Sequence, residues 1–234
     1  MNQSMEIESI RERIENIRSS IRAAALSSGR TPDDVKLVAV SKNFPPEDVL
    51  KAYSCDIRRF GENRVQELEK KAAVLPSDIE WHMIGHLQSN KVIKAVNNAA
   101  FIHSVDNLEL LKRIEKICDQ QSKVVKALIE VNVSGEESKF GTVSEEELLC
   151  MCEKAKDMSS LEFCGLMTMA PYGENEIGLR KIFSKLRNFA ERLQMEFGFG
   201  RLELSMGMSS DYVIAVEEGA TIVRIGSAIF GERK

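Results

Sequence analysis

The sequence predicts an α/β protein built as one (β/α)8 barrel with an additional helix at its N-terminus. Short apolar runs alternate with longer amphipathic segments along most of the 234 residues. Strands that alternate with helices pair in parallel through right-handed crossovers. Eight such units in about 200 residues match a closed barrel better than an open, doubly wound sheet, which is the alternative.

The first expected element is a helix over residues 4–28, where apolar positions recur near a 3.6-residue period and Gly29 provides a stop. Seven amphipathic segments separate the expected strands, and the short segment AIFGERK closes the chain. The eight expected strands are 35–41, 58–62, 80–85, 101–105, 126–133, 161–168, 201–206 and 221–226. We therefore expect one domain over residues 1–234.

Three local signals support the expected helices. Pro46 fits the first position of a helix, where its missing N–H costs nothing. Asp106 and Ser144 stand where N-cap residues belong, and Glu147 follows Ser144 by three residues as in a capping box.

The composition is that of a soluble globular protein. Hydrophobic residues make up 43% of the chain, and the 29% of charged residues are interspersed rather than grouped. No apolar run approaches the ~18 residues of a membrane span, and the N-terminus lacks the apolar core of a secretory signal, so we expect a cytoplasmic protein. The net charge of −4 argues against non-specific binding to nucleic acid.

Cysteine and histidine spacing does not predict a metal site. Cys150 and Cys152 fall on an expected helix, where positions two apart point in different directions. His82 and His86 would lie ~13 Å apart on a strand, too far to share an ion. The odd number of cysteines predicts free thiols. The five are Cys55, Cys118, Cys150, Cys152 and Cys164.

Polar residues and glycines gather where the expected strands end, which is the pole where barrels carry chemistry. The segments SMGMSSD (205–211) and RIGSAIFG (224–231) follow the last two strands and lead into expected helices. Each segment alone is typical of capping serines and turn glycines. Together, at this pole, they favour a phosphate site, because N–H groups at helix starts attract phosphate.

Lys42 ends the first strand, in the stretch VAVSKNFPP. Strand alternation puts Val38, Val40 and Lys42 on one face, which we expect to point into the barrel. Partial desolvation there would lower the lysine pKa and leave a nucleophilic amine able to form a Schiff base with an aldehyde. A solvated lysine at a strand end is the alternative.

Arg224 interrupts the otherwise apolar strand TIVRIG. Arg224 lies two residues after Ile222, on the same face of the strand. It therefore points into the barrel if Val223 and Ile225 face the helices. A buried arginine needs a partner. The two hypotheses are a polar ligand atom and a structural ion pair with a carboxylate such as Glu203 or Glu62.

The sequence resembles the pyridoxal-phosphate homeostasis proteins, also called the PROSC or YggS-like family. Residues 37 nearly to the C-terminus carry the resemblance. The matching stretches are LVAVSK, FGENRVQE, WHMIGHLQSNK, IHSVD, VNVSGEESKFG, GLMTMAP and LSMGMSSDYVIAVEEGATIVRIGSAIFG. The resemblance implies a barrel like the N-terminal domain of alanine racemase, the type III fold of pyridoxal-phosphate proteins.

The resemblance also implies a role for particular residues toward pyridoxal 5'-phosphate. Lys42 is expected to hold it covalently as an aldimine, and Arg224 to face the pyridine nitrogen. A cation there disfavours protonation of the ring, which weakens it as an electron sink. The remaining expected cofactor-binding residues are Asn63 and Met206, with Ser209, Gly226 and Ser227 at the phosphate; Ser227 stands where relatives often have threonine.

The function that the resemblance implies is vitamin B6 homeostasis: buffering, protecting and delivering the cofactor without robust catalytic turnover. One alternative is an amino-acid racemase of the alanine racemase type, which takes a second base, a tyrosine, from an additional β domain. Only eight residues follow Gly226, so we expect no such domain. Of the three tyrosines, Tyr53, Tyr172 and Tyr212, only Tyr172 after the sixth strand is a candidate. A barrel aldolase that uses Lys42 on a sugar phosphate is a more distant alternative.

The expected partners are pyridoxal phosphate and, as recipients, pyridoxal-phosphate-dependent apoenzymes. We expect a monomer or weak dimer, with no membrane or nucleic-acid partner. Lys139, in SGEESKFG, is expected to be an exposed loop lysine with at most a minor role at the rim.

Overall fold

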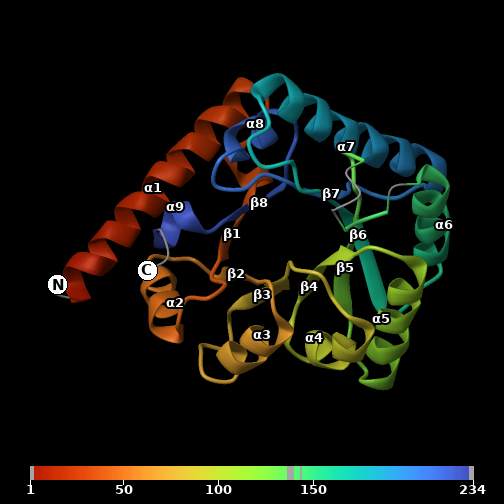
Figure 1. Ribbon diagram of the computed structural model, residues 1–234, viewed down its shortest axis with the longest axis horizontal. Helices are drawn as coiled ribbons and strands as arrows, with labels where there is room; N and C mark the ends of the chain where they lie inside the picture. The colour runs from red at the N-terminus through yellow and green to blue at the C-terminus, as the bar shows by residue number, and fades with distance from the viewer. Residues whose placement is uncertain (1–2, 136–139, 143, 232–234) are drawn as a thin grey trace.

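Eight parallel strands form a closed barrel that helices surround (Figure 1). This computed structural model describes residues 3–135, 140–142 and 144–231. The strands follow one another around the barrel in chain order, and β8 pairs with β1 to close it. The predicted fold class, a (β/α)8 barrel with an extra N-terminal helix, is therefore confirmed, and the open sheet is excluded.

The secondary structure follows the predicted rhythm. The strands are β1 Lys36–Val40, β2 Arg59–Glu62, β3 Glu80–Met83, β4 Phe101–Val105, β5 Val125–Glu130, β6 Leu161–Met167, β7 Glu203–Ser205 and β8 Ile222–Ile225. The helices are α1 Gln3–Ser27, α2 Pro46–Tyr53, α3 Val65–Ala72, α4 Val92–Asn98, α5 Leu108–Gln120, α6 Glu145–Lys156, α7 Glu176–Phe197, α8 Tyr212–Glu217 and α9 Ser227–Phe230. Short 3-10 helices occupy Pro32–Asp34 and Ser89–Lys91.

Two of the three predicted helix starts are confirmed. Pro46 is the first residue of α2, and Ser144 caps α6 by accepting a first-turn backbone N–H at 3.2 Å. The prediction for Asp106 is wrong, because Asn107 caps α5 and accepts a first-turn N–H at 2.8 Å. The Asp106 carboxylate instead lies 3.1 Å from the His86 ring.

Side-chain alternation divides the apolar residues into two layers. Val223 and Ile225 pack in the layer between barrel and helices, as the predicted parity of β8 requires. Arg224 lies between them in sequence and is buried, so it points into the barrel. The apolar cluster inside the barrel consists of Val38, Phe101, Leu128, Met167 and Ile222.

The extra helix α1 lies across the outside of the barrel, against α2, α8 and α9 (Figure 1). Its isoleucines at 10, 14, 17 and 21 are buried, a spacing that places them on one helical face. From the same helix, Arg13 Nη1 donates to the carbonyl oxygen of Ile229 in α9 at 2.8 Å. Helices α1 and α9 are thus joined by a side-chain hydrogen bond.

All five cysteines are free thiols, and Cys150 and Cys152 lie on α6 with the first exposed and the second buried. Within the described residues, no group of three or more His, Cys, Asp or Glu side chains could hold a metal ion. His82 and His86 have different partners, since His82 contacts His103 and His86 contacts Asp106. None of the described helices combines the length and apolar character needed to cross a membrane.

Candidate functional site

Lys42 lies in a turn just beyond β1, at the carboxyl end of the barrel, and is half-buried. β1 pairs with β2 through Val40 and Gly61, and with β8 through Ala39 and Ile225. The residues that follow β2 and β8 are therefore the neighbours of Lys42 around the mouth.

A buried network holds the residue that precedes Lys42. Lys71 Nζ, from α3, lies 2.6 Å from Glu62 Oε1 and donates to the carbonyl oxygen of Ser41 at 2.8 Å. Ser41 Oγ donates to the same carboxylate oxygen at 2.6 Å. Burial raises the pKa of Glu62, while the hydrogen bonds from Lys71 and Ser41 act in the opposite direction. The backbone before Lys42 is thus fixed from inside the protein.

The residues after Lys42 are fixed as well. Asn43 adopts a left-handed backbone conformation, with φ of 65°, and its N–H donates to Glu67 Oε2 at 2.9 Å. The Phe44 ring lies 4.9 Å from the Phe230 ring of α9, measured between centroids. The turn that carries Lys42 therefore has anchors on α3 and on α9.

Two backbone N–H groups that follow β8 converge on Ser209, which lies in the loop after β7. Ser209 Oγ accepts from the N–H groups of Gly226 and Ala228 at 3.3 and 3.4 Å, both long hydrogen bonds. Ser227, between them, begins α9. A Cβ atom at position 226 would lie 3.2 Å from the carbonyl oxygen of Val40, so a side chain there would crowd β1. Backbone N–H and hydroxyl groups in this arrangement can donate hydrogen bonds to the oxygen atoms of a phosphate.

Arg224 is buried and held by neutral oxygens. Its Nη1 donates to Ser205 Oγ at 2.6 Å, and its Nη2 donates to the carbonyl oxygen of Thr168 at 2.9 Å. The hypothesis of an ion pair with Glu203 or Glu62 is wrong, because each of these carboxylates pairs with a lysine. Across the described part of the chain, no carboxylate lies within 4.0 Å of Arg224.

The carboxyl groups closest to this cation are themselves perturbed. Burial lowers the pKa of Arg224 to about 10, and Glu130 and Asp211 act against that shift. Burial raises the pKa of Glu130 to about 7 and also raises that of Asp211. Near neutral pH Glu130 is thus partly protonated, and it offsets the guanidinium less than an ordinary carboxylate would.

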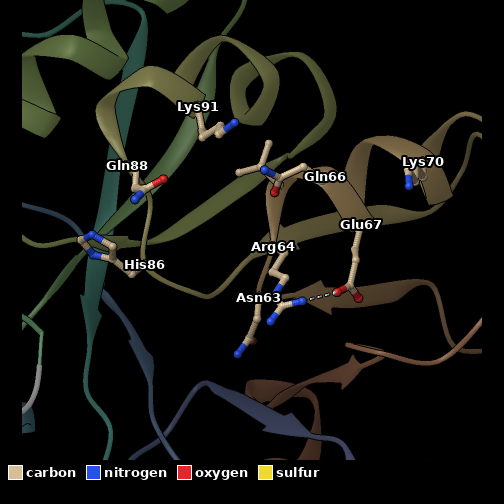
Figure 2. Close-up of a pocket in the computed structure, with 9 residues that line it drawn as sticks. Asn63, Arg64, Gln66, Glu67, Lys70, His86, Gln88 and Lys91 are labelled. Carbon is tan, nitrogen blue, oxygen red and sulfur yellow. Dashed lines mark ion pairs between the residues drawn. The ribbon is translucent and has the colours of Figure 1, made fainter.

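Asn63, after β2, lines a cavity of about 610 Å³ beside the mouth. Figure 2 shows the segment after β3 on one side of this cavity and the start of α3 on the other. A Cβ at Gly85 would lie 2.3 Å from the carbonyl oxygen of Asn63, so the close approach of these segments requires glycine. Asn63 is the one expected cofactor-binding residue in its lining, which consists of Asn63, Arg64, Val65, Gln66, Glu67, Lys70, His86, Gln88 and Lys91.

Two further expectations have different outcomes. The Met206 side chain packs in the layer between barrel and helices, and its backbone N–H donates to the carbonyl oxygen of Ile222 at 3.1 Å. Only its backbone is therefore available near the mouth. Lys139 lies outside the described residues.

Sequence reasoning missed Lys71, and it included Ser205 only within the stretch SMGMSSD, not as the partner of Arg224. Ser205 ends β7 at the carboxyl pole, so its position alone could have indicated it. Lys71 offers no such signal, because its spacing in α3 is that of any surface lysine. Its pairing with Glu62 depends on how α3 packs on β2.

Comparison with known proteins agrees with this arrangement. The family described as "Alanine racemase, N-terminal domain" matches residues 10–234. Fold and site thus define a barrel of the alanine racemase N-terminal class. A distant solved alanine racemase from Clostridium difficile 630, 14% identical with a TM-score of 0.74, shares this fold over 97% of the chain and 60% of its own length.

The chain belongs to the family of the pyridoxal phosphate homeostasis proteins, as its sequence motifs predicted. The relative of that name from Aquifex aeolicus (strain VF5) is 44% identical over 224 residues, covering 95% of this chain and 98% of the relative. The solved structure of PipY from Synechococcus elongatus PCC7942 with PLP bound has a TM-score of 0.83 and 38% identity, covering 95% of this chain and 100% of PipY. PipY without PLP gives a TM-score of 0.86.

Proposed function

We propose that this chain binds pyridoxal 5'-phosphate through an imine bond to Lys42 and serves the homeostasis of vitamin B6 inside the cell. In this role it takes up the reactive aldehyde, protects it and delivers it to apoenzymes that require it. The names of the relatives and the PLP-bound structure of PipY support the proposal. One domain over residues 1–234, a cytoplasmic location and a monomeric or weakly dimeric state remain predictions.

The observation that carries the proposal is the meeting of three kinds of group at one end of the barrel. Lys42 supplies an amine, the Ser209 loop supplies phosphate donors, and Arg224 supplies a buried cation with no carboxylate of the described residues within 4.0 Å. The barrel register supports this, because β1 and β8 are paired up to Ala39 and Ile225 and the residues after both strands lie at the same end of the barrel. An aldehyde, a phosphate and a pyridine ring need these three complements.

We assign the residues accordingly. Lys42 holds the aldehyde carbon, while Ser209, Gly226 and Ser227 bind the phosphate, and Arg224 faces the pyridine nitrogen. Asn63 and the backbone of Met206 complete the site. When bound, pyridoxal phosphate supplies an electrophilic carbon and a ring that can withdraw electrons.

The same residues argue against efficient catalysis. The Arg224 cation disfavours a proton on the ring nitrogen, and an unprotonated ring withdraws electrons weakly. A racemase also needs a second base opposite the lysine. Tyr172 is fully exposed, and the Tyr53 hydroxyl donates to Asp78, close to the amino end of β3. We therefore propose a binding protein rather than a racemase.

The first test is an absorbance spectrum of the freshly purified protein before and after borohydride. We expect a visible imine band, and after reduction a labelled peptide that contains Lys42. Lys42→Ala should abolish the band, whereas Lys91→Ala, at the neighbouring cavity, should keep it. An unchanged band in Lys42→Ala would refute the anchor, and a protein that takes up no pyridoxal phosphate would refute the function.

A second assay separates the binding protein from the racemase. Incubation of the loaded protein with each alanine enantiomer should give no appreciable racemisation by chiral chromatography. Steady turnover would favour the racemase instead.

A further inference from the structure

A chain of hydrogen bonds crosses the barrel interior below the candidate site. Arg224 Nη1 donates to Ser205 Oγ at 2.6 Å, and Ser205 Oγ lies 2.8 Å from His103 Nδ1. His103 Nε2 lies 2.8 Å from His82 Nδ1, and His82 Nε2 lies 3.2 Å from Glu80 Oε1. Ser205, His103 and His82 are fully buried. The chain thus runs from the carboxyl pole to Glu80, the first residue of β3.

The two ends of the chain fix its direction. A guanidinium only donates and a carboxylate only accepts, whereas a hydroxyl and a neutral imidazole can do both. Ser205 accepts from Arg224, so its single hydrogen goes to His103 Nδ1. His103 then carries its hydrogen on Nε2 and donates to His82, which in turn donates from Nε2 to Glu80. Each bond has one donor and one acceptor when both histidines are neutral.

The surroundings favour these neutral imidazoles. Burial lowers the pKa of His82 and lowers that of His103 well below its usual range. The hydrogen bond to His82 holds the pKa of Glu80 at about 2, so this end of the chain stays an acceptor. The His82 ring is also stacked on Phe101, 4.6 Å away with an interplanar angle of 7°. The charged groups around the two rings are Glu80, Arg59, Lys36 and Arg224.

Reversing the donor–acceptor direction of this hydrogen-bond chain would change the contact between Ser205 and Arg224. If His82 became protonated, its Nδ1 would donate, and His103 would have to move its own hydrogen to Nδ1. Ser205 would then face two donors, and its hydroxyl hydrogen would lose the acceptor on His103. The orientation of the Ser205 hydroxyl, and with it the direction of the lone pair that accepts from Arg224, therefore depends on the tautomer of His103.

We infer that His103 and His82 are positioning residues of the cofactor site, which orient the Ser205 hydroxyl and thereby hold the Arg224 guanidinium toward the cofactor ring. The inference rests on the proposed function only where it sets Arg224 beside the ring. The direction of the chain itself is a property of the protein without ligand.

The direct test is long-range 1H–15N NMR on the protein without pyridoxal phosphate. We expect both imidazoles to be neutral, with hydrogen on Nε2, at pH 7. Hydrogen on Nδ1 of either ring, or a charged ring, would overturn the inference. This result does not depend on pyridoxal phosphate, so it separates failure of this inference from failure of the proposed function.

The second test uses substitutions in the loaded protein. His103→Leu removes the acceptor for Ser205, whereas His103→Asn offers its amide oxygen in place of Nδ1. Leu128→Ala is the matched control, because it disturbs the same interior without touching the chain. We expect His103→Leu to weaken pyridoxal phosphate binding roughly tenfold and to shift the pH midpoint of the bound absorbance, as loss of support for a charged hydrogen bond implies.

His103→Asn should recover most of the affinity and the wild-type midpoint, and Leu128→Ala should leave the midpoint unchanged. A His103→Leu protein that behaves like Leu128→Ala would overturn the inference, as would a His103→Asn protein without recovery. If His103→Leu does not fold, the His103→Asn midpoint and the wild-type NMR spectrum decide.

Discussion

Two buried cations flank the mouth of the barrel, and their partners differ in kind. Lys71 meets the carboxylate of Glu62 directly, at 2.6 Å. Arg224 is equally buried, yet a hydroxyl and a carbonyl oxygen hold it. The charge of Lys71 is thus balanced within the protein, where it fixes the backbone next to Lys42. Arg224 has no direct counter-ion among the described residues, and we propose that its charge faces the ligand.

The comparison separates stability from function. Breaking a buried ion pair is costly, but a cation in such a pair is not available to bind a ligand. A buried cation on neutral oxygens has its desolvation offset less completely, so its contacts contribute less to stability than those of a buried ion pair. Retaining such a group is therefore best understood through what it binds.

The largest expected effect on stability comes from breaking the ion pair between Lys71 and Glu62. Lys71→Met leaves Glu62 buried without its counter-ion, and should lower the free energy of unfolding by about 3–5 kcal/mol in urea denaturation. Lys94→Met is the matched control, since Lys94 pairs with Glu69 on the surface. That control should change stability by only about 0–1 kcal/mol. Equal losses in the two variants would contradict the role given to the Lys71 pair.

A smaller loss of stability is expected when Arg224 is replaced. Arg224→Met leaves only neutral acceptors behind and should lower the free energy of unfolding by about 2–3 kcal/mol. The same substitution should also weaken pyridoxal phosphate binding, at least roughly tenfold in Kd. Urea denaturation and cofactor titration of the same preparation measure both. Unchanged binding with a loss of stability equal to that of Lys71→Met would erase the distinction between the two cations.

The smallest effect concerns the carboxyl group near Arg224. Because the folded pKa of Glu130 is raised to about 7, the folded state binds the proton more tightly than the unfolded state does. Stability from this group is therefore present at low pH and falls as the pH rises from about 4.5 to about 7.

Glu130→Gln removes this dependence. Wild-type protein should lose roughly 1–2 kcal/mol more than the variant between pH 6 and pH 8. Denaturant unfolding of both proteins at the two pH values measures the difference. Parallel pH profiles would show that Glu130 is not the group that titrates.

The sequence allowed the barrel and part of the mouth to be predicted because those features repeat locally. Strand parity alone placed Val38 and Arg224 toward the interior, and both lie there. The N-cap of α5 lies one residue later than predicted. Asp106 and Asn107 are both good capping residues; in the fold Asn107 accepts the first-turn N–H, while Asp106 contacts His86.

The hydrogen-bonded partners inside the barrel could not be predicted in the same way. His82 and His103 lie on neighbouring strands and meet only because of the barrel register. The sequence invited comparison of His82 with His86, which is close in the chain but has a different partner. The assignment of Lys42 to the cofactor remains a prediction.

The bond from Arg13 to Ile229 is the first of the contacts that connect the N-terminal helix to the turn carrying Lys42. α1 is bonded to α9, and Phe230 of α9 packs against Phe44. Phe44 lies two residues beyond Lys42. A substitution that removes the Arg13 guanidinium would therefore weaken the support of the Lys42 turn without touching a barrel strand.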